Sequence, residues 1–223
     1  LSIHEKLIVI LDMGSKIQQC INTDEYDNIK SVVNDYLKEG IAHTLDETRN
    51  LSDSGQFEDI SLQQGIRQIL YPYEEMEVLN PEWEVILKDI IDSLFEQMSD
   101  EEYNILNEEF GTYMVSRAYE YRQLLEYLVF RYFAKSIYDY DFLGKCQMLV
   151  TNFFVIRQMD IIRWLDNHRE YSFKDRMDVV HIFSRQVEYS EDNIENLYED
   201  FIFDDIFKTD SLIAILWIDS ENI

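Results

Sequence analysis

The chain has 223 residues, 46% hydrophobic and 14% aromatic, a composition that excludes a disordered protein and allows a substantial core. Its formal charge of −26 argues against nucleic acid and against a membrane surface as partners, because phosphate groups require a basic footprint. Six glycines and two prolines are too few for frequent tight turns. We therefore expect an all-α fold, a multi-helix bundle of about eight to ten helices with orthogonal or irregular packing.

The N-terminal part is expected to form two helices, over about 3–20 and 24–45. A polar, small and aperiodic stretch follows them, which is typical of a linker or loop. The resulting division is an N-terminal helical pair at 1–49, a linker or loop at 50–60 and a main helical domain at 61–223. One continuous domain over 1–223 is the alternative.

Helix boundaries in the main part are indicated by capping residues. These are Asn80 before Pro81, Ser99 with Glu102, Ser172 with Asp175, and Ser190. A helix from Ser61 is expected to end at Tyr71-Pro72, because the residue before proline disfavours the α conformation. Gly111 is expected to separate the helix after Ser99 from a long helix at 112–137. A last apolar segment at 212–218 is too short to classify by periodicity.

The most apolar helix is expected at 142–167. Its polar residues, which include Arg157 and Asp160, interrupt the roughly 20 apolar residues that a membrane span needs, so we interpret it as a buried core helix. The two cysteines, Cys20 and Cys146, lie in apolar helical contexts and are expected to be buried thiols of a cytoplasmic protein. No signal peptide is visible. Because the chain begins at Leu1 and not at Met, we favour a fragment of a longer protein over a complete protein.

Two stripes are expected along the helix that follows Ser172. The apolar stripe consists of Phe173, Met177, Val180, Ser184 and Val187, and the polar stripe of Lys174, Asp178, His181, Arg185 and Glu188. An Arg185–Glu188 pair would stabilise an exposed helix by only about 0.2–0.5 kcal/mol. Either the polar stripe is a solvated face, or Arg185 and Glu188 line a groove against another helix, with His181 able to titrate near neutral pH.

A second cluster spans 124–133. Either its aromatic residues pack in the core while Arg131 extends to solvent, or Tyr127 and Tyr132 form a pocket near Glu126 that accommodates an alkylammonium group. The four histidines lie in separate segments, without a second histidine or a cysteine at metal-ligand spacing. We therefore expect no metal site in this chain.

Taken together and in this order, the two clusters resemble the C-terminal region of the flagellin lysine-N-methylase family. The matching residues are Tyr127-Leu128-Val129 and Ser184-Arg185-Gln186-Val187-Glu188, with the apolar helix between them. The chain departs from the family pattern at Leu125-Glu126, where the family has Glu-Asn, and at Tyr189, where it has His. The family's N-terminal cysteine cluster has no counterpart among the two cysteines.

The resemblance implies that the full-length bacterial protein transfers methyl groups to lysine side chains of flagellin, using S-adenosylmethionine and an iron–sulfur cluster. It implies no cofactor in this chain, which would be a scaffold or substrate-facing part that is inactive alone. Flagellin or another lysine-bearing protein is the expected partner. Catalytic residues are not indicated, and the candidates for a substrate pocket are Glu126, Tyr127, Arg131, His181, Arg185 and Glu188. The alternatives are a non-enzymatic acidic adaptor that docks a basic helix or tail, and a helical module that only dimerises.

Overall fold

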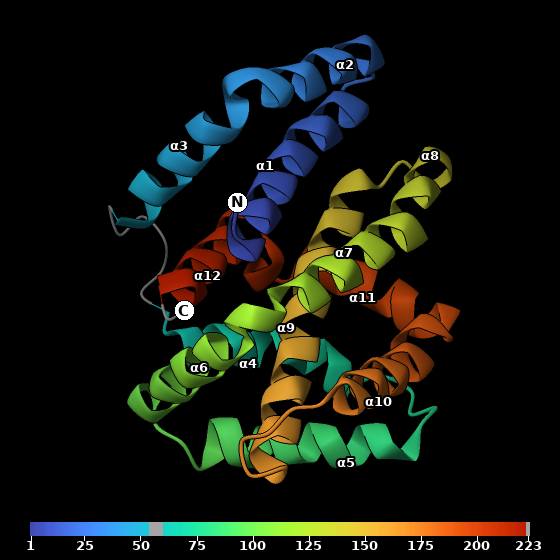
Figure 1. Ribbon diagram of the computed structural model, residues 1–223. Coiled ribbons are helices and arrows are strands. Elements are labelled where there is room, and N and C mark those ends of the chain that lie inside the picture. The colour runs from blue at the N-terminus through green and yellow to red at the C-terminus, as the bar shows by residue number, and fades with distance from the viewer. Residues whose placement is uncertain (54–59, 222–223) are drawn as a thin grey trace.

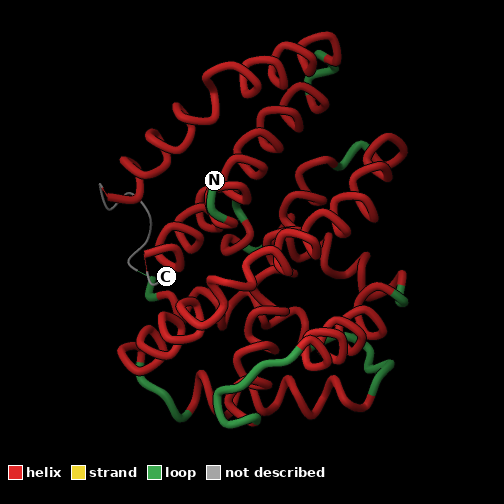
Figure 2. Tube along the Cα trace, viewed as in Figure 1, coloured by secondary structure: helices red, strands yellow, loops and turns green. Residues whose placement is uncertain are grey.

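The computed structural model describes residues 1–53 and 60–221, and every regular element in these ranges is helical (Figures 1 and 2). The expected all-α fold is therefore confirmed. The α-helices are α1 (Ile3–Asn22), α2 (Tyr26–Asp35), α3 (Ile41–Asp53), α4 (Leu62–Glu74), α5 (Pro81–Ile90), α6 (Asp100–Met114), α7 (Ala118–Tyr132), α8 (Ser136–Asp139), α9 (Phe142–Asp166), α10 (Phe173–Phe183), α11 (Glu191–Phe203) and α12 (Thr209–Glu221). Short π-helical turns, η1 (Tyr36–Gly40), η2 (Ile91–Glu96) and η5 (Ser184–Glu188), and 3₁₀ turns, η3 (Val115–Arg117), η4 (Phe133–Lys135) and η6 (Asp205–Phe207), join several of them.

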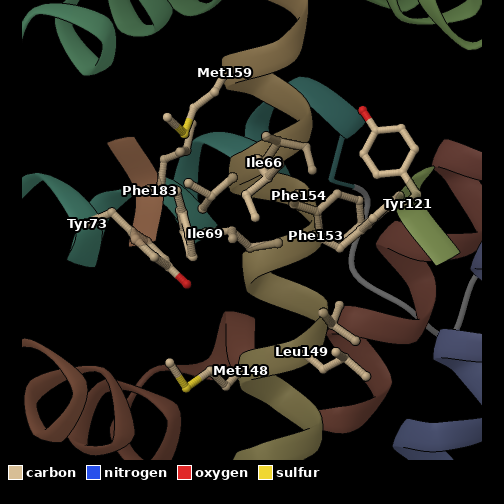
Figure 3. Close-up of a cluster of buried hydrophobic side chains, with 14 of the residues drawn as sticks. Ile66, Ile69, Tyr73, Tyr121, Met148, Leu149, Phe153, Phe154, Met159 and Phe183 are labelled. Carbon is tan, nitrogen blue, oxygen red and sulfur yellow. The ribbon is translucent and has the colours of Figure 1, made fainter. Parts of the chain in front are cut away.

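Helix α9 runs through the centre of the fold, as expected for a helix that is apolar on most sides (Figure 1). All its residues from 144 to 162 are buried. Helices α1, α4, α5, α7, α10 and α11 pack around it. The close-up in Figure 3 shows the α9 side chains Phe153, Phe154 and Met159 among those of Ile66, Tyr73 and Phe183 from α4 and α10. No helix in the described ranges is both long enough and apolar enough to cross a membrane.

The polar residues of α9 are buried with partners. Asp160, which is 0% exposed, accepts hydrogen bonds from Arg176 Nη1 at 2.5 Å, from the Tyr121 hydroxyl at 2.6 Å and from the Tyr171 hydroxyl. Glu120 bonds the other side of Arg176, with 3.2 Å between Oε2 and Nε. These contacts join α7, α9 and α10. They satisfy a charge that would be costly to bury alone.

A second polar cluster ties the two ends of the chain to the core. Asp219 of α12 lies 2.7 Å from His4 Nε2 of α1 and accepts a 2.5 Å hydrogen bond from Asn107 Nδ2 of α6. Arg157 of α9 donates to Asn107 Oδ1 at 3.0 Å. Helix α1 thus packs on both α9 and α12, while α2, η1 and α3 return along α1 (Figure 1).

Several boundaries differ from the expected ones. Helix α3 continues to Asp53, so residues 50–53 of the expected linker are helical, and 54–59 lie outside the described residues. The division of the chain at this point stays a prediction. Helix α4 continues through Pro72 to Glu74, because packing overrides the local preference: Tyr73 is fully buried and its hydroxyl donates to Asn152 Oδ1 at 2.8 Å.

Gly111 does not end a helix. It lies inside α6, where the buried side chains of Phe110 and Met114 on either side hold the helix against the core. The break comes instead at the 3₁₀ turn η3. The expected caps at Asn80, Ser99, Ser172 and Ser190 are confirmed, each side chain accepting a hydrogen bond from a backbone N–H of the first turn.

Candidate functional site

The two sequence clusters meet in space where α7 lies beside η5. Glu188, the last residue of η5, accepts hydrogen bonds from two phenols of α7. The Tyr132 hydroxyl lies 3.0 Å from Glu188 Oε1, and the Tyr127 hydroxyl lies 3.2 Å from Oε2. Glu188 and Tyr132 are buried, whereas Tyr127 is 45% exposed. Tyr127 therefore forms the outer edge of this group of three residues, which we name the Glu188 site.

Electrostatics favour the neutral form of both phenols in the Glu188 site. Burial raises the pKa of Tyr132, and the negative charge of Glu188 raises it further. The pKa of Tyr127 is raised by the same two causes, against an opposing effect of Arg131. The Arg131 guanidinium lies 5.8 Å from the centre of the Tyr132 ring, and Lys135 Nζ lies 5.9 Å from it. Two phenols use about half of the acceptor positions of a carboxylate, so Glu188 can accept further N–H donors.

Gln186 fixes the π-turn η5 against the segment before α5. Its Oε1 accepts hydrogen bonds from the backbone N–H groups of Leu79, at 2.9 Å, and Asn80, at 3.2 Å. Its Nε2 donates to the Glu77 carbonyl at 2.7 Å, and the side chain is 0% exposed. Gln186 thereby holds the start of α5 against the end of α10.

The Arg185–Glu188 pair that the i, i+3 spacing allows does not form in the described residues. In the described chain Arg185 is exposed and makes no ion pair, while Glu188 points into the interior toward α7. The reason is the π-turn, which contains more residues per turn than an α-helix and rotates Glu188 away from the line through His181 and Arg185.

The expected apolar stripe of α10 is also wrong at its start. Phe173 is 69% exposed and Met177 is 52% exposed. The buried face carries Arg176, Val179 and Ile182 instead, because the contacts of Arg176 with Asp160 and Glu120 turn that side of the helix inward.

His181 and Arg185 line a groove that contains none of the residues of the Glu188 site. The groove encloses about 560 Å³ between α5, the end of α9, and α10 with η5. Its lining comprises Glu82, Val85, Ile86, Asp89, Ile162, Arg163, Asp166, Asp178, His181, Ile182 and Arg185. We name it the α5–α10 groove. Its volume falls within the range of small-molecule and side-chain binding pockets, roughly 300–1,000 Å³.

The six candidate residues thus separate into three places. Tyr127 and Glu188 belong to the Glu188 site, with Arg131 at its edge. His181 and Arg185 lie in the α5–α10 groove. Glu126 is exposed and contacts Arg122, with 3.5 Å between Oε1 and Nε. The carboxylate that meets both phenols is therefore Glu188, and Glu126 lies outside both places.

The buried ion pair of Asp160 and Arg176 was not expected from the sequence. Asp160 appeared there only as an interruption of the apolar helix, although an acidic residue inside such a helix needs a partner. Sequence spacing gave no sign of Arg176 as that partner, because the two residues lie on different helices and meet only through tertiary packing. This pair joins α9 to α10.

The residues of this chain do not fit an iron–sulfur cluster. Such clusters are held mainly by cysteine thiolates, usually four, and the chain has two cysteines, both buried. Burial raises the pKa of the Cys146 thiol, which disfavours the thiolate that a metal needs. Within the described ranges, no group of three or more His, Cys, Asp and Glu side chains is arranged to hold a metal ion.

A comparison with protein families identifies a family for this chain. A family model described as the FliB lysine N-methylase C-terminal domain matches residues 1–215. Neither a curated protein nor a solved structure matches the chain.

Proposed function

Because the chain belongs to the FliB lysine N-methylase C-terminal domain family, we propose that it is the helical, substrate-facing part of a protein that methylates lysine side chains of flagellin. The family match over residues 1–215 carries the proposal. The contact between the two sequence clusters supports it. Residues 61 positions apart, Tyr127 and Glu188, meet through a hydrogen bond.

In this proposal the chain supplies binding surface and rigidity. The Glu188 site offers a carboxylate between two phenols, and the α5–α10 groove offers charged walls over an apolar floor. S-adenosylmethionine supplies the methyl group. The iron–sulfur cluster that the resemblance implies needs thiolates that these 223 residues lack, so a different part of the protein would hold it. The isolated chain is therefore expected to be inactive.

Methyl transfer to purified flagellin tests the proposal. The complete gene product, supplied with S-adenosylmethionine and its reconstituted cluster, is expected to add methyl groups to flagellin lysines, detected as mass increments on lysine-containing peptides. The 223-residue chain under the same conditions is expected to add none. Transfer by the chain alone would contradict the assigned role. Binding of flagellin without methylation by the complete protein would favour the acidic adaptor instead.

A further inference from the structure

The walls of the α5–α10 groove carry one residue pattern twice. On α5 the lining residues are Glu82, Val85, Ile86 and Asp89, and on α10 and η5 they are Asp178, His181, Ile182 and Arg185. Each set follows the spacing i, i+3, i+4 and i+7, which places its members on one side of a helix. In both sets an isoleucine is central and charged residues stand at the ends.

The two walls run antiparallel. Gln186, just after α10, bonds the backbone of Asn80, just before α5, so the end of one helix lies at the start of the other (Figure 1). Asp89 therefore lies at the Asp178 end of the groove, and Glu82 lies at the Arg185 end. Helix α9 ends beside the start of α10, which adds Asp166 to the first of these ends. Three carboxylates thus gather there, and we name this the acidic end.

The floor between the two ends is apolar and fixed. Ile86, Ile162 and Ile182 line the groove and are buried, one from each of the three helices. The hydrogen bonds of Gln186 to the segment before α5 keep the two walls in place. The groove is therefore preformed and needs no rearrangement to receive a side chain.

The carboxylates of the acidic end are not held in ion pairs within the described chain. Among the described residues, Asp89, Asp166 and Asp178 take part in no ion pair, although exposed acids elsewhere do, such as Asp92 with Lys88. Two basic residues lie near this end: Arg163 also lines the groove, and Lys88, which precedes Asp89, interacts with it electrostatically. Three carboxylates that form no ion pair with a described residue, beside an apolar floor, are complementary to a long side chain with a terminal positive charge.

We propose that the α5–α10 groove binds a lysine side chain of the protein substrate. The ammonium group lies at the acidic end, and the methylene stem lies on the three isoleucines. Arg185 at the opposite end faces the flanking peptide, where its guanidinium can donate to a carbonyl or a carboxylate. This assignment rests on the proposed function, from which it takes lysine as the substrate side chain.

Peptide binding to the 223-residue chain tests the groove directly. The probe is a fluorescent peptide with one lysine flanked by alanine and leucine, and its comparison is the same peptide with the lysine Nε-acetylated. We expect the acetylated peptide to bind at least about tenfold more weakly, since acetylation removes the charge. Affinity for the unmodified peptide is also expected to fall with added salt, because the carboxylates are exposed.

Matched variants separate the groove from the general negative charge. Asp89→Asn/Asp166→Asn/Asp178→Asn neutralises the acidic end. Asp27→Asn/Glu108→Gln/Glu195→Gln removes the same charge at exposed positions on α2, α6 and α11, outside the groove. The first variant is expected to weaken binding about tenfold, and the second less than about twofold. Equal losses in both variants, or equal binding of the acetylated peptide, would overturn the assignment.

A methylation assay with the complete protein separates the lysine-binding role of the groove from the proposed methylase function. If the complete protein methylates flagellin but the groove variant binds the peptide as well as the unsubstituted chain does, the lysine-binding role of the groove is wrong and the proposed function still stands. If the peptide binds only with its lysine unmodified and the groove variant abolishes this binding, the lysine-binding role of the groove is supported. This holds even if the complete protein does not methylate flagellin, a result that would refute the proposed function.

Discussion

Replacing Arg176 with Met should lower the free energy of unfolding by about 3–5 kcal/mol, because the carboxylate of Asp160 then stays buried without its counter-charge. Asp160 is 0% exposed, and the Arg176 guanidinium lies 2.5 Å away. The Tyr121 and Tyr171 hydroxyls remain as hydrogen-bond donors in the variant. They are neutral, however, so they replace only part of the lost stabilisation.

The double variant Asp160→Asn/Arg176→Met measures the coupling between the two charges. Asp160→Asn alone leaves Arg176 with Glu120 at 3.2 Å, so we expect a smaller loss of about 1–3 kcal/mol. Removing both charges should cost less than the sum of the single losses, with a coupling free energy of about 2 kcal/mol. Arg185→Met is the matched control, since Arg185 is exposed and makes no ion pair in the described chain.

Urea unfolding followed by far-UV circular dichroism gives these free energies, provided that all variants unfold with the same dependence on urea concentration. A loss below about 1 kcal/mol for Arg176→Met would refute the reasoning, because such a loss is typical of an exposed ion pair. Strict additivity of the two single substitutions, within about 0.5 kcal/mol, would refute it as well.

Two further predictions follow from the placement of charged groups. Arg185→Ala should change the free energy of unfolding by less than about 0.5 kcal/mol, because this side chain is exposed. Glu188→Ala should lower it by about 1–3 kcal/mol, because the buried Tyr132 hydroxyl loses its acceptor. Equal losses in urea unfolding would contradict the different orientations of these two side chains. Burial alone would raise the pKa of Asp219, but the charges of Arg157 and His4 and the hydrogen bonds from His4 and Asn107 outweigh it and lower the pKa to about 2. Since the folded-state pKa lies below the unfolded value of 3.8, the carboxylate contributes about 2 kcal/mol above pH 4, and this is lost as the pH falls toward 2. Stability measured against pH should therefore fall less steeply in this range for Asp219→Asn than for the unsubstituted chain, and parallel curves would count against the low pKa.

Features that depend on local chemistry were predictable from the sequence. The caps at Ser99 and Ser172 have a side-chain oxygen and an acidic residue three positions later, so each can satisfy the backbone of its own first turn. The buried helix α9 was predictable for a similar reason, since its apolar residues leave no solvated face.

Features that depend on packing between distant segments were not predictable. The π-turn η5 and the continuation of α4 past Pro72 follow from tertiary contacts, those of Gln186 and of Tyr73. The candidate site shows the consequence. His181 and Arg185 do share a side of their helix, but one π-turn moves Glu188 to a different place beside Tyr127 and Tyr132. A period of 3.6 residues cannot anticipate that change.

Mass spectrometry of flagellin from the source organism shows whether this protein methylates flagellin lysines. The comparison is between cells with the intact gene and cells in which it is deleted. If the protein is a lysine methylase acting on flagellin, lysine peptides with methyl mass increments appear only with the intact gene, and restoring the gene restores them. Identical lysine methylation of flagellin in both strains, or no methylation in either, would contradict the account.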